Sequence, residues 1–409
     1  MKNAKINLIL VSAFLVMNSV YGQLSLTKTK LEGREAYTLQ NDKMRISMLT
    51  GGGYIAELSL ISSDQKESIN PLFIPHYKTI DPHIYNAEQH GDLYTTGING
   101  KLMAGYMGHY LCFPYFGRPN SEFEEKTGSS LHGEAYTVKY ELETALKDES
   151  AVIRASAILP STKYSISRSI TLLQGQSVAL VEEVIENQES FDRPYQYVQH
   201  VTFGKPFVEY GKTFVDAPVS RIAFSRQKDD PLNSSTVQWP IIRTNEGDEI
   251  NAGVFGSEKG EGAYRAWFMD PGRDFSWFTM YNKDFNLLVG YVFEKDENPW
   301  IGDWQENQRD RSLPRNGNVV AWGLEVGTTP FGSGIKQSID RGPIFETATY
   351  RWIGAKEKKK QSYLVFLMEI NDSFKGVKEL KLEEGAIILT EKESAQQIRI
   401  ANSFSLPKD

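Results

Sequence analysis

The strongest constraint on the fold is an alternation of apolar and polar residues with a period of two. Residues 137–144 read TVKYELET, in which Val138, Tyr140 and Leu142 alternate with charged side chains. Such alternation is typical of a strand with one buried face, because successive strand side chains point to opposite sides. The same reading predicts strands at 151–159, 164–173, 178–185, 275–281 and 286–293. No segment of a dozen residues has helical spacing, so the sequence predicts an all-β chain folded as a large antiparallel β-sandwich.

Composition and charge argue against a nucleic-acid-binding protein and against disulfide bonds. The chain has 409 residues, long enough to bury a large core, and its 45 basic and 52 acidic residues give a net charge of -7. Because the two signs are interspersed, the basic surface that binds nucleic acid is not expected. The single cysteine, Cys112, cannot form an internal disulfide. It lies in the apolar run LCFPYF, which predicts a buried, inert thiol.

The N-terminal segment has the pattern of a signal peptide. Lys2 and Lys5 precede an apolar stretch at 6–16 that is too short to cross a bilayer. Val20 and Gly22 are small enough for the −3 and −1 positions of a cleavage site. We expect cleavage after Gly22, with residues 1–22 removed and a periplasmic or secreted protein that keeps no membrane anchor. Residues 23–355 are predicted to form the sandwich. Residues 356–409 are predicted to add strands that complete the sandwich or are appended to it.

Familiar catalytic motifs are absent from the sequence. The histidines at 76, 83, 90, 109, 132 and 200 are not in the spacing of a zinc site, so we expect no metal. The sequence has no P-loop, nucleophile elbow or dinucleotide fingerprint, and we therefore expect no cofactor.

Polar residues interrupt the strand-like runs at three places. A Gly- and Pro-rich loop holds Arg118 and later delivers His132, and both side chains suit the hydroxyls of a sugar. His200 follows aromatic and apolar residues, where a desolvated imidazole can act as a general acid or base. Glu325 lies in an apolar strand, where a buried carboxylate needs a partner or a function. Structural alternatives stay open: a surface arginine, a histidine that caps a turn, a core histidine bonded to a carbonyl, and a glutamate paired with an arginine.

Three stretches break the strand rhythm and are expected to be functional loops: residues 75–108, 269–274 and 296–316. The last of them carries Trp300, Trp304 and Gln305. Aromatic rings stack on the apolar face of a pyranose and amides bind its hydroxyls, so Trp304 and Gln305 are candidate substrate-binding residues. Packing of the tryptophans in the core is the alternative.

Taken in order, these motifs resemble the galactose mutarotase (aldose 1-epimerase) superfamily. The likeness rests on HGEA at 132–135, VEEVIENQESFDRPYQYVQHVTFGKPF at 181–207 and GLEVGTTPF at 323–331, and it covers roughly residues 35–350. The resemblance implies that His200 protonates the ring oxygen of a sugar and that Glu325 removes the proton of the anomeric hydroxyl. It also implies that Arg118 and His132 bind sugar hydroxyls.

Two features of the resemblance need separate mention. Asp303 is the first candidate for the family's sugar-binding aspartate, and Asp270 is the second. The segment VTFGKPF at 201–207 differs from the shorter loop of typical aldose 1-epimerases. This difference suggests an outlying branch, exported by its expected signal peptide, for which substrates other than a simple hexose stay open.

Three functional hypotheses follow from the sequence. The favoured one is an isomerase of the aldose 1-epimerase type that acts on a mono- or oligosaccharide as a monomer or dimer. The second is a carbohydrate-binding protein without catalysis on the same fold. The third is a polysaccharide lyase or hydrolase, which would need a second carboxylate beside the bond that is cleaved.

Overall fold

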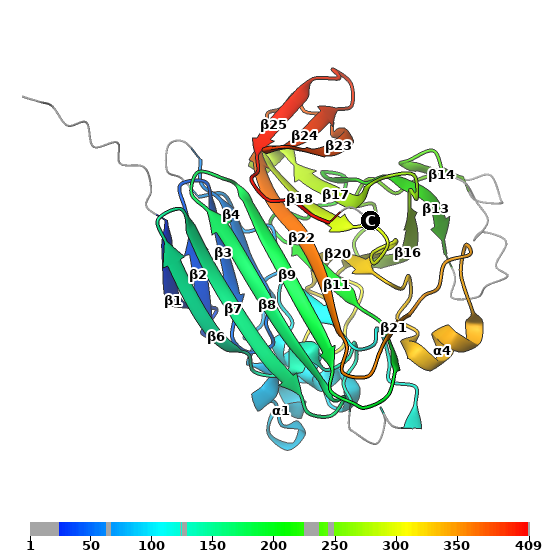
Figure 1. Cartoon of the computed structure of the whole chain (residues 1–409). Coiled ribbons are helices and arrows are strands. Elements are labelled where there is room, and N and C mark those ends of the chain that lie inside the picture. The colour runs from blue at the N-terminus through cyan, green and yellow to red at the C-terminus, as the bar shows by residue number, and fades with distance from the viewer. Residues whose placement is uncertain are drawn as a thin grey trace, which may run out of the picture.

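The protein is described here by a computed structural model that covers residues 24–62, 67–122, 124, 129–224, 237–243 and 249–407. The predicted signal peptide at 1–22 lies outside these residues. Two large antiparallel sheets dominate the described chain (Figure 1). The predicted all-β sandwich is confirmed.

The first sheet has ten strands and carries most of the residues discussed below. Its spatial order is β1 (Ser25–Leu31), β2 (Arg34–Gln40), β3 (Met44–Leu49), β4 (Ile55–Leu60), β5 (His109–Cys112), β11 (Val198–Gly204), β20 (Val320–Gly327), β19 (Trp300–Asn307), β16 (Glu261–Met269) and β13 (Val219–Ala223).

The second sheet has eight strands. Its spatial order is β12 (Thr213–Asp216), β17 (Phe275–Asn282), β18 (Leu287–Glu294), β22 (Lys358–Glu369), β9 (Val178–Asn187), β8 (Tyr164–Leu173), β7 (Ser150–Leu159) and β6 (Glu141–Lys147). Five of the six predicted strands match β7, β8, β9, β17 and β18 to within about two residues. The sixth, at 137–144, is only half correct. Residues 138–140 bond to the turn at 50–52, so β6 begins at Glu141.

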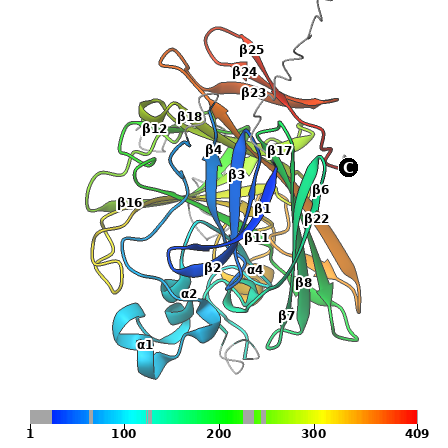
Figure 2. The same cartoon turned by 90° about the vertical axis from the view of Figure 1, so that its left-hand side faces the viewer.

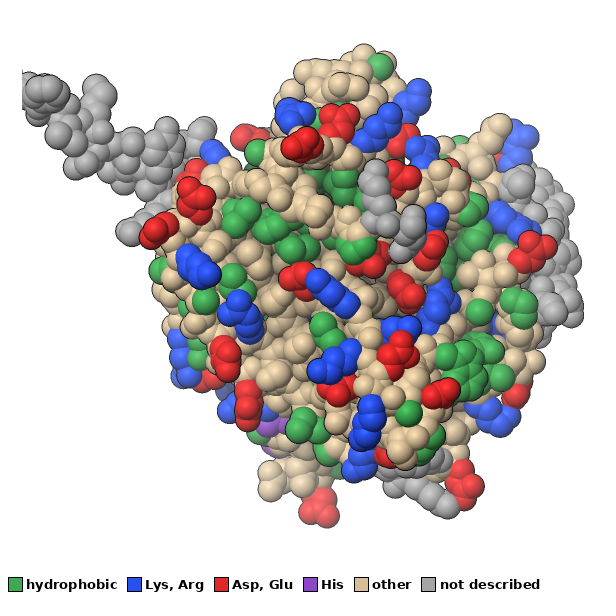
Figure 3. Space-filling model, viewed as in Figure 1, with side chains coloured by type: hydrophobic (Ala, Val, Ile, Leu, Met, Phe, Trp, Pro, Cys, Tyr) green, Lys and Arg blue, Asp and Glu red, His purple; other side chains and the backbone are tan. Residues whose placement is uncertain are grey.

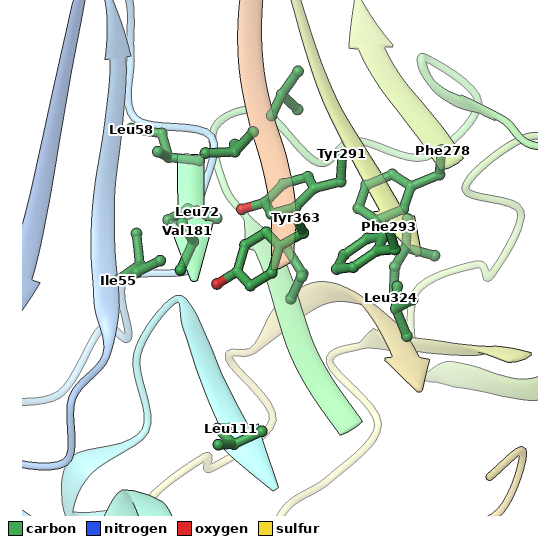
Figure 4. Packing of buried hydrophobic residues seen from close by; sticks show 14 of the residues in the cluster. Ile55, Leu58, Leu72, Leu111, Val181, Phe278, Tyr291, Phe293, Leu324 and Tyr363 are labelled. Atoms are coloured by element: carbon green, nitrogen blue, oxygen red, sulfur yellow. The ribbon is translucent and has the colours of Figure 1, made fainter. Parts of the chain in front are cut away.

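The main core fills the space between the two sheets. Leu111 and Leu324 from the first sheet pack in the same cluster as Val181, Tyr291 and Tyr363 from the second (Figure 4). Burial of this apolar surface is the dominant stabilising contribution. Cys112 is buried and free, as the sequence predicted.

The C-terminal segment both completes the sandwich and extends it. β22 lies between β18 and β9 in the eight-stranded sheet, so residues 356–409 contribute a strand to the sandwich. β23 (Val377–Glu383), β24 (Ala386–Glu391) and β25 (Gln397–Ala401) form a separate sheet that packs against β17, β18 and β22 through its own apolar cluster (Figure 1).

Short elements complete the described chain. Two helices, α1 (Ala87–Tyr94) and α2 (Gly100–Gly105), lie at one end of the sandwich (Figure 2) and belong to the predicted loop at 75–108. The others are α4 (Gly334–Arg341), the pairs β10 (Arg193–Tyr195) with β21 (Arg351–Ile353) and β14 (Ile241–Arg243) with β15 (Glu249–Asn251), and the 3-10 turns Pro82–Ile84, Gly97–Asn99, Ala135–Thr137 and Lys283–Phe285. Among the described helices, none has the length and apolar character needed to cross a membrane.

An ion pair between a buried arginine and a half-buried aspartate fixes the helical segment to the first sheet. Arg34 on β2 binds Asp81 through Nε at 2.7 Å and donates to the carbonyls of Gly105 and Gly51 at 2.9 and 2.7 Å. One guanidinium therefore joins three separate parts of the chain. On the outer face in the view of Figure 3, acidic and basic side chains are interspersed, in line with the charge pattern of the sequence.

Candidate active site

Strand register brings His200 and Glu325 together. His200 on β11 is directly opposite Glu325 on β20, and Glu325 is directly opposite Gly302 on β19. Residues opposite one another in antiparallel strands share a face of the sheet. The neighbours Val201 and Leu324 belong to the main core. The shared face of His200 and Glu325 therefore points away from that core.

The two side chains are in direct contact. Nε2 of His200 lies 3.0 Å from Oε1 of Glu325, and the two side chains are 5% and 4% exposed. A carboxylate beside Nε2 requires a proton between the two atoms, so the pair is joined by a charge-assisted hydrogen bond when His200 is protonated. The sequence left open that Glu325 pairs with an arginine; among the described residues its ionic partner is His200 instead.

A cavity of ≈ 470 Å³ opens over this face of the sheet, which is within the usual range for small-molecule sites. Helix α2, the turn before β6 and the loop after β19 supply its other walls. Its lining comprises Thr95, Asn99, Leu102, Met103, Tyr106, Tyr110, Phe116, Gly117, Arg118, Leu131, His132, His200, Tyr264, Trp304, Asp310, Ser312, Leu313, Arg315, Glu325 and Gly332. Aromatic and polar groups thus surround the His200–Glu325 pair.

Glu325 is held from its other side by a tyrosine. The hydroxyl of Tyr264 on β16 lies 2.8 Å from Oε2 of Glu325 and 2.8 Å from the carbonyl oxygen of Pro330. Gly302 leaves room for this arrangement, because a Cβ there would lie 2.5 Å from Oε2 of Glu325 and 2.6 Å from the Tyr264 hydroxyl. The carboxylate therefore has a fixed position.

Aromatic rings enclose His200. The ring of Tyr110 stacks on it with centroids 4.7 Å apart at 18°, and Trp304 meets it edge-on at 6.2 Å. Nδ1 of His200 lies 2.9 Å from Oγ1 of Thr202, which in turn lies 2.9 Å from the hydroxyl of Tyr106. Among the residues that the structure describes, the His200 ring is bonded to the side chains of Thr202 and Glu325 and not to a backbone carbonyl, so the core-histidine alternative does not describe it.

His132 and Arg118 both line the same cavity. His132 adopts a left-handed backbone conformation with φ 65°, and its ring stacks on Phe116 at 4.7 Å. Nδ1 of His132 accepts a hydrogen bond from the N–H of Gly117 at 3.1 Å. Burial, with His200 and Arg315 nearby, holds the pKa of His132 well below its usual range. His132 is therefore neutral with its proton on Nε2, where it can be donated to a ligand. The Arg118 side chain is exposed.

Asp303 and Gln305 lie on the opposite face of β19, and this corrects their predicted place in the cavity. Asp303 is fully buried, where Arg265 binds its Oδ2 through Nε and Nη2 at 2.6 Å each. Trp322 donates to its Oδ1 at 2.8 Å, and burial raises the pKa of Asp303. Oε1 of Gln305 accepts from the hydroxyl of Ser257 at 3.0 Å. Since strand side chains alternate, Trp304 alone of these three faces the cavity.

The predicted loop at 296–316 is also corrected, because most of its first half is the strand β19. Trp300 is fully buried and packs on Phe268 and Phe345, so the core-packing alternative holds for that residue. Asp270, the second aspartate candidate, binds Arg273 at 3.1 Å and does not line the cavity.

Comparison with solved structures finds proteins of similar fold. A candidate aldose 1-epimerase from Klebsiella pneumoniae superposes with a TM-score of 0.60 at 15% identity, over 85% of this chain and 83% of that one. A galactose mutarotase-like protein from Clostridium acetobutylicum gives 0.56 at 11% identity, over 85% and 99%. A candidate mutarotase from Salmonella typhimurium gives 0.51 at 10%, over 84% and 94%. The chain has the galactose mutarotase-like fold. No protein-family model and no curated protein matches it by sequence.

The cavity contains residues that sequence reasoning missed. Tyr264 and Tyr106 reach the site from β16 and from the end of α2, and they contact Glu325 and Thr202 as described above. Arg315 lies with its guanidinium carbon 5.2 Å from the Trp304 ring centroid, and it binds Asp310 at 3.3 Å. The run DRSLPR at 310–315 carries both charges in a turn-rich segment, which was the signal available in the sequence.

Among the described residues, no group of three or more His, Cys, Asp or Glu side chains is arranged to hold a metal ion.

Proposed function

We propose that the protein is a sugar mutarotase of the aldose 1-epimerase type, which binds a reducing sugar in the cavity and interconverts its α and β anomers. The observation that carries this proposal is the contact of 3.0 Å between an imidazole and a carboxylate in the wall of a sugar-sized cavity. The mutarotase-like fold of the chain supports a carbohydrate-related function.

The paired groups suit the chemistry of an anomeric centre. The ring oxygen and the anomeric hydroxyl are bonded to one carbon, so an acid and a base that are one hydrogen bond apart can reach both. Protonated His200 gives its Nε2 proton to the ring oxygen while Glu325 takes the proton of the anomeric hydroxyl. The bond from the anomeric carbon to the ring oxygen breaks, and an open-chain aldehyde forms. Rotation about the C1–C2 bond and the reverse proton transfers then close the ring as the other anomer.

The remaining cavity residues suit the binding of hydroxyl groups and of a sugar face. The Nε2–H of His132 and the guanidinium of Arg118 are donors for sugar oxygens. The Trp304 ring offers an apolar surface to the C–H face of a pyranose. Asp303 and Gln305 have no part in this proposal, because they face the other side of the sheet.

The test is the rate of anomer exchange for D-glucose, D-galactose and other reducing sugars, followed by polarimetry. His200→Gln and Glu325→Gln are expected to lower the rate by about 100-fold or more, since each removes one of the paired proton transfers. His76→Gln is the matched control, because that histidine is exposed and outside the cavity. If both cavity variants fold and exchange anomers at the wild-type rate, the proposal is wrong.

A carbohydrate-binding role without catalysis is the second candidate. It is favoured by one observation: both carboxylate oxygens of Glu325 are already hydrogen-bonded, to His200 and to Tyr264. In that case calorimetry would find sugar affinity unchanged in Glu325→Gln and reduced in Arg118→Ala and Trp304→Ala. Wild-type protein would then show no anomer exchange in the polarimeter.

We further propose that residues 1–22 direct export and are cleaved after Gly22. The basic start, the short apolar stretch and the small residues before Gln23 support this proposal. N-terminal sequencing of the protein recovered from a bacterial periplasm or culture medium tests it. A mature chain that still begins at Met1 would contradict it.

A further inference from the structure

Three buried side chains form a hydrogen-bonded chain that ends at the reactive imidazole. Tyr106, Thr202 and His200 are 2%, 0% and 4% exposed. The Tyr106 hydroxyl lies 2.9 Å from Oγ1 of Thr202, and Oγ1 lies 2.9 Å from Nδ1 of His200. Beyond His200, the chain continues to Glu325 through Nε2. The Thr202 hydroxyl is the partner that the described residues give to Nδ1.

Thr202 has a fixed position of its own. Its backbone N–H donates to the carbonyl of Gly108 at 3.2 Å, and its carbonyl accepts from the N–H of Phe73 at 2.8 Å. The backbone bonds leave the hydroxyl with two neighbours, His200 and Tyr106. A hydroxyl has one proton to donate and lone pairs to accept, so it can serve Nδ1 in either protonation state of the ring.

The direction of the chain follows from the charge on His200. When the ring is protonated, Nδ1–H donates to Thr202, and the Thr202 hydroxyl donates to the Tyr106 oxygen. The proton of Tyr106 is then free for an acceptor in the cavity that this residue lines. When the ring is neutral in the sugar-free site, its remaining proton lies on Nε2 beside the Glu325 carboxylate. The chain then reverses: Tyr106 donates to Thr202, and Thr202 donates to Nδ1. A neutral ring that has given its Nε2 proton to a sugar keeps its proton on Nδ1 instead.

The other groups around His200 do not replace this chain. Tyr110 stacks on one ring face, and His132 and Trp304 meet the ring edge-on at 5.7 and 6.2 Å. Arg315 interacts electrostatically with the Tyr106 phenol, and His109 with the His200 ring, but neither is hydrogen-bonded to these groups in the described structure. Burial raises the pKa of Tyr106, so its hydroxyl keeps its proton.

We propose that Thr202 and Tyr106 are positioning residues that hold Nδ1 of His200, so that Nε2 remains the nitrogen that exchanges a proton with the sugar. The proposal rests on the proposed function. During ring opening His200 gives up its Nε2 proton and keeps its Nδ1 proton on Thr202, and ring closure returns the Nε2 proton. The number of protons is unchanged over the cycle.

The test compares two matched substitutions at one buried position. Thr202→Ser keeps the hydroxyl, whereas Thr202→Val keeps the shape and removes it. The first readout is the ¹⁵N NMR spectrum of histidine-labelled protein without any sugar, with the His200 signals assigned by their loss in His200→Gln. The second is the anomer exchange of D-glucose and D-galactose. Tyr106→Phe is the additional variant, because it keeps the Thr202–His200 bond.

In Thr202→Val the Nδ1 signal of His200 is expected to shift from its wild-type position, and kcat to fall about 10- to 100-fold, as for the loss of a hydrogen bond to a charged group. Thr202→Ser is expected to keep both the signal and most of kcat, and Tyr106→Phe to give a smaller loss. If Thr202→Val has the same His200 signals and rate as the wild-type protein, the proposal is overturned. If the wild-type protein exchanges no anomers but Thr202→Val, unlike Thr202→Ser, moves the His200 signals, the hydrogen-bonded chain stands and the proposed function fails.

Discussion

Gly302→Ala provides a sharp test of how the site is packed. Gly302 is directly opposite Glu325, and a Cβ there would lie 2.5 Å from Oε2 of Glu325 and 2.6 Å from the Tyr264 hydroxyl. Those two atoms are joined to each other by a hydrogen bond of 2.8 Å. Gly302 is not among the residues with positive φ, so alanine is compatible with the backbone. Only the clash with the site opposes the substitution.

The size of the effect follows from opposing contributions. Replacing glycine by alanine in a compatible backbone stabilises a protein by about 0.4–1 kcal/mol, through the unfolded state. Against this, overpacking costs about 1–3 kcal/mol, and loss of a hydrogen bond to a charged group costs about 1.5–3 kcal/mol. We expect the free energy of unfolding to fall by about 1.5–5.5 kcal/mol. A displacement of Glu325 by about 1 Å relative to His200 would slow anomer exchange about 100-fold.

Urea unfolding and polarimetry measure the two quantities. Gly256→Ala is the matched control, because its Cβ would find its nearest neighbour, the carbonyl oxygen of Val254, at 3.7 Å. That control is expected to keep wild-type stability and activity. A Gly302→Ala protein with wild-type stability and rate would refute the packing of Glu325 against Tyr264.

Three further predictions concern residues away from the cavity. Burial lowers the pKa of His109 from 6.5 to about 3, so the unfolded chain binds more protons below pH 6.5 and stability falls as the pH drops from 6.5 towards 3. Urea titrations should show a loss of about 1.6 kcal/mol from this group between pH 6.5 and pH 5, and a His109→Gln variant with an unchanged pH slope would contradict it. Arg34→Met leaves Asp81 without this partner and should lower the free energy of unfolding by about 3 kcal/mol, with faster proteolysis within residues 75–108. Cleavage of that segment at the wild-type rate would contradict this prediction. Asp303→Ala strands the buried Arg265 and should lower the free energy of unfolding by about 3–5 kcal/mol; a variant of wild-type stability with lost sugar affinity would instead return Asp303 to the site.

Local patterns were enough to predict the fold class. Period-two alternation depends only on neighbouring residues, so β7, β8, β9, β17 and β18 could be found from the sequence. The same pattern failed at 137–144, because residues 138–140 alternate but bond to a different part of the chain. The stretch 296–316 reads as a loop because it contains Pro and Asp and breaks the alternation, yet its residues 300–307 form strand β19.

The site was only partly predictable. The motif order pointed to Arg118, His132, His200 and Glu325, and the structure brings these four to one cavity. Alternation says that Trp304 faces away from its two neighbours Asp303 and Gln305, but it does not say which face is the cavity.

By itself, then, the sequence determined five strands of the eight-stranded sheet, the sandwich class and the order of the motif-bearing segments, because these depend on spacing along the chain. Tertiary structure decided the register of β11, β20 and β19, which sets His200 against Glu325 and leaves room at Gly302. It also decided the arrival of Tyr106, Tyr264 and Arg315 from distant segments. Such contacts are long-range in sequence, and packing of the two sheets, not local propensity, selects them.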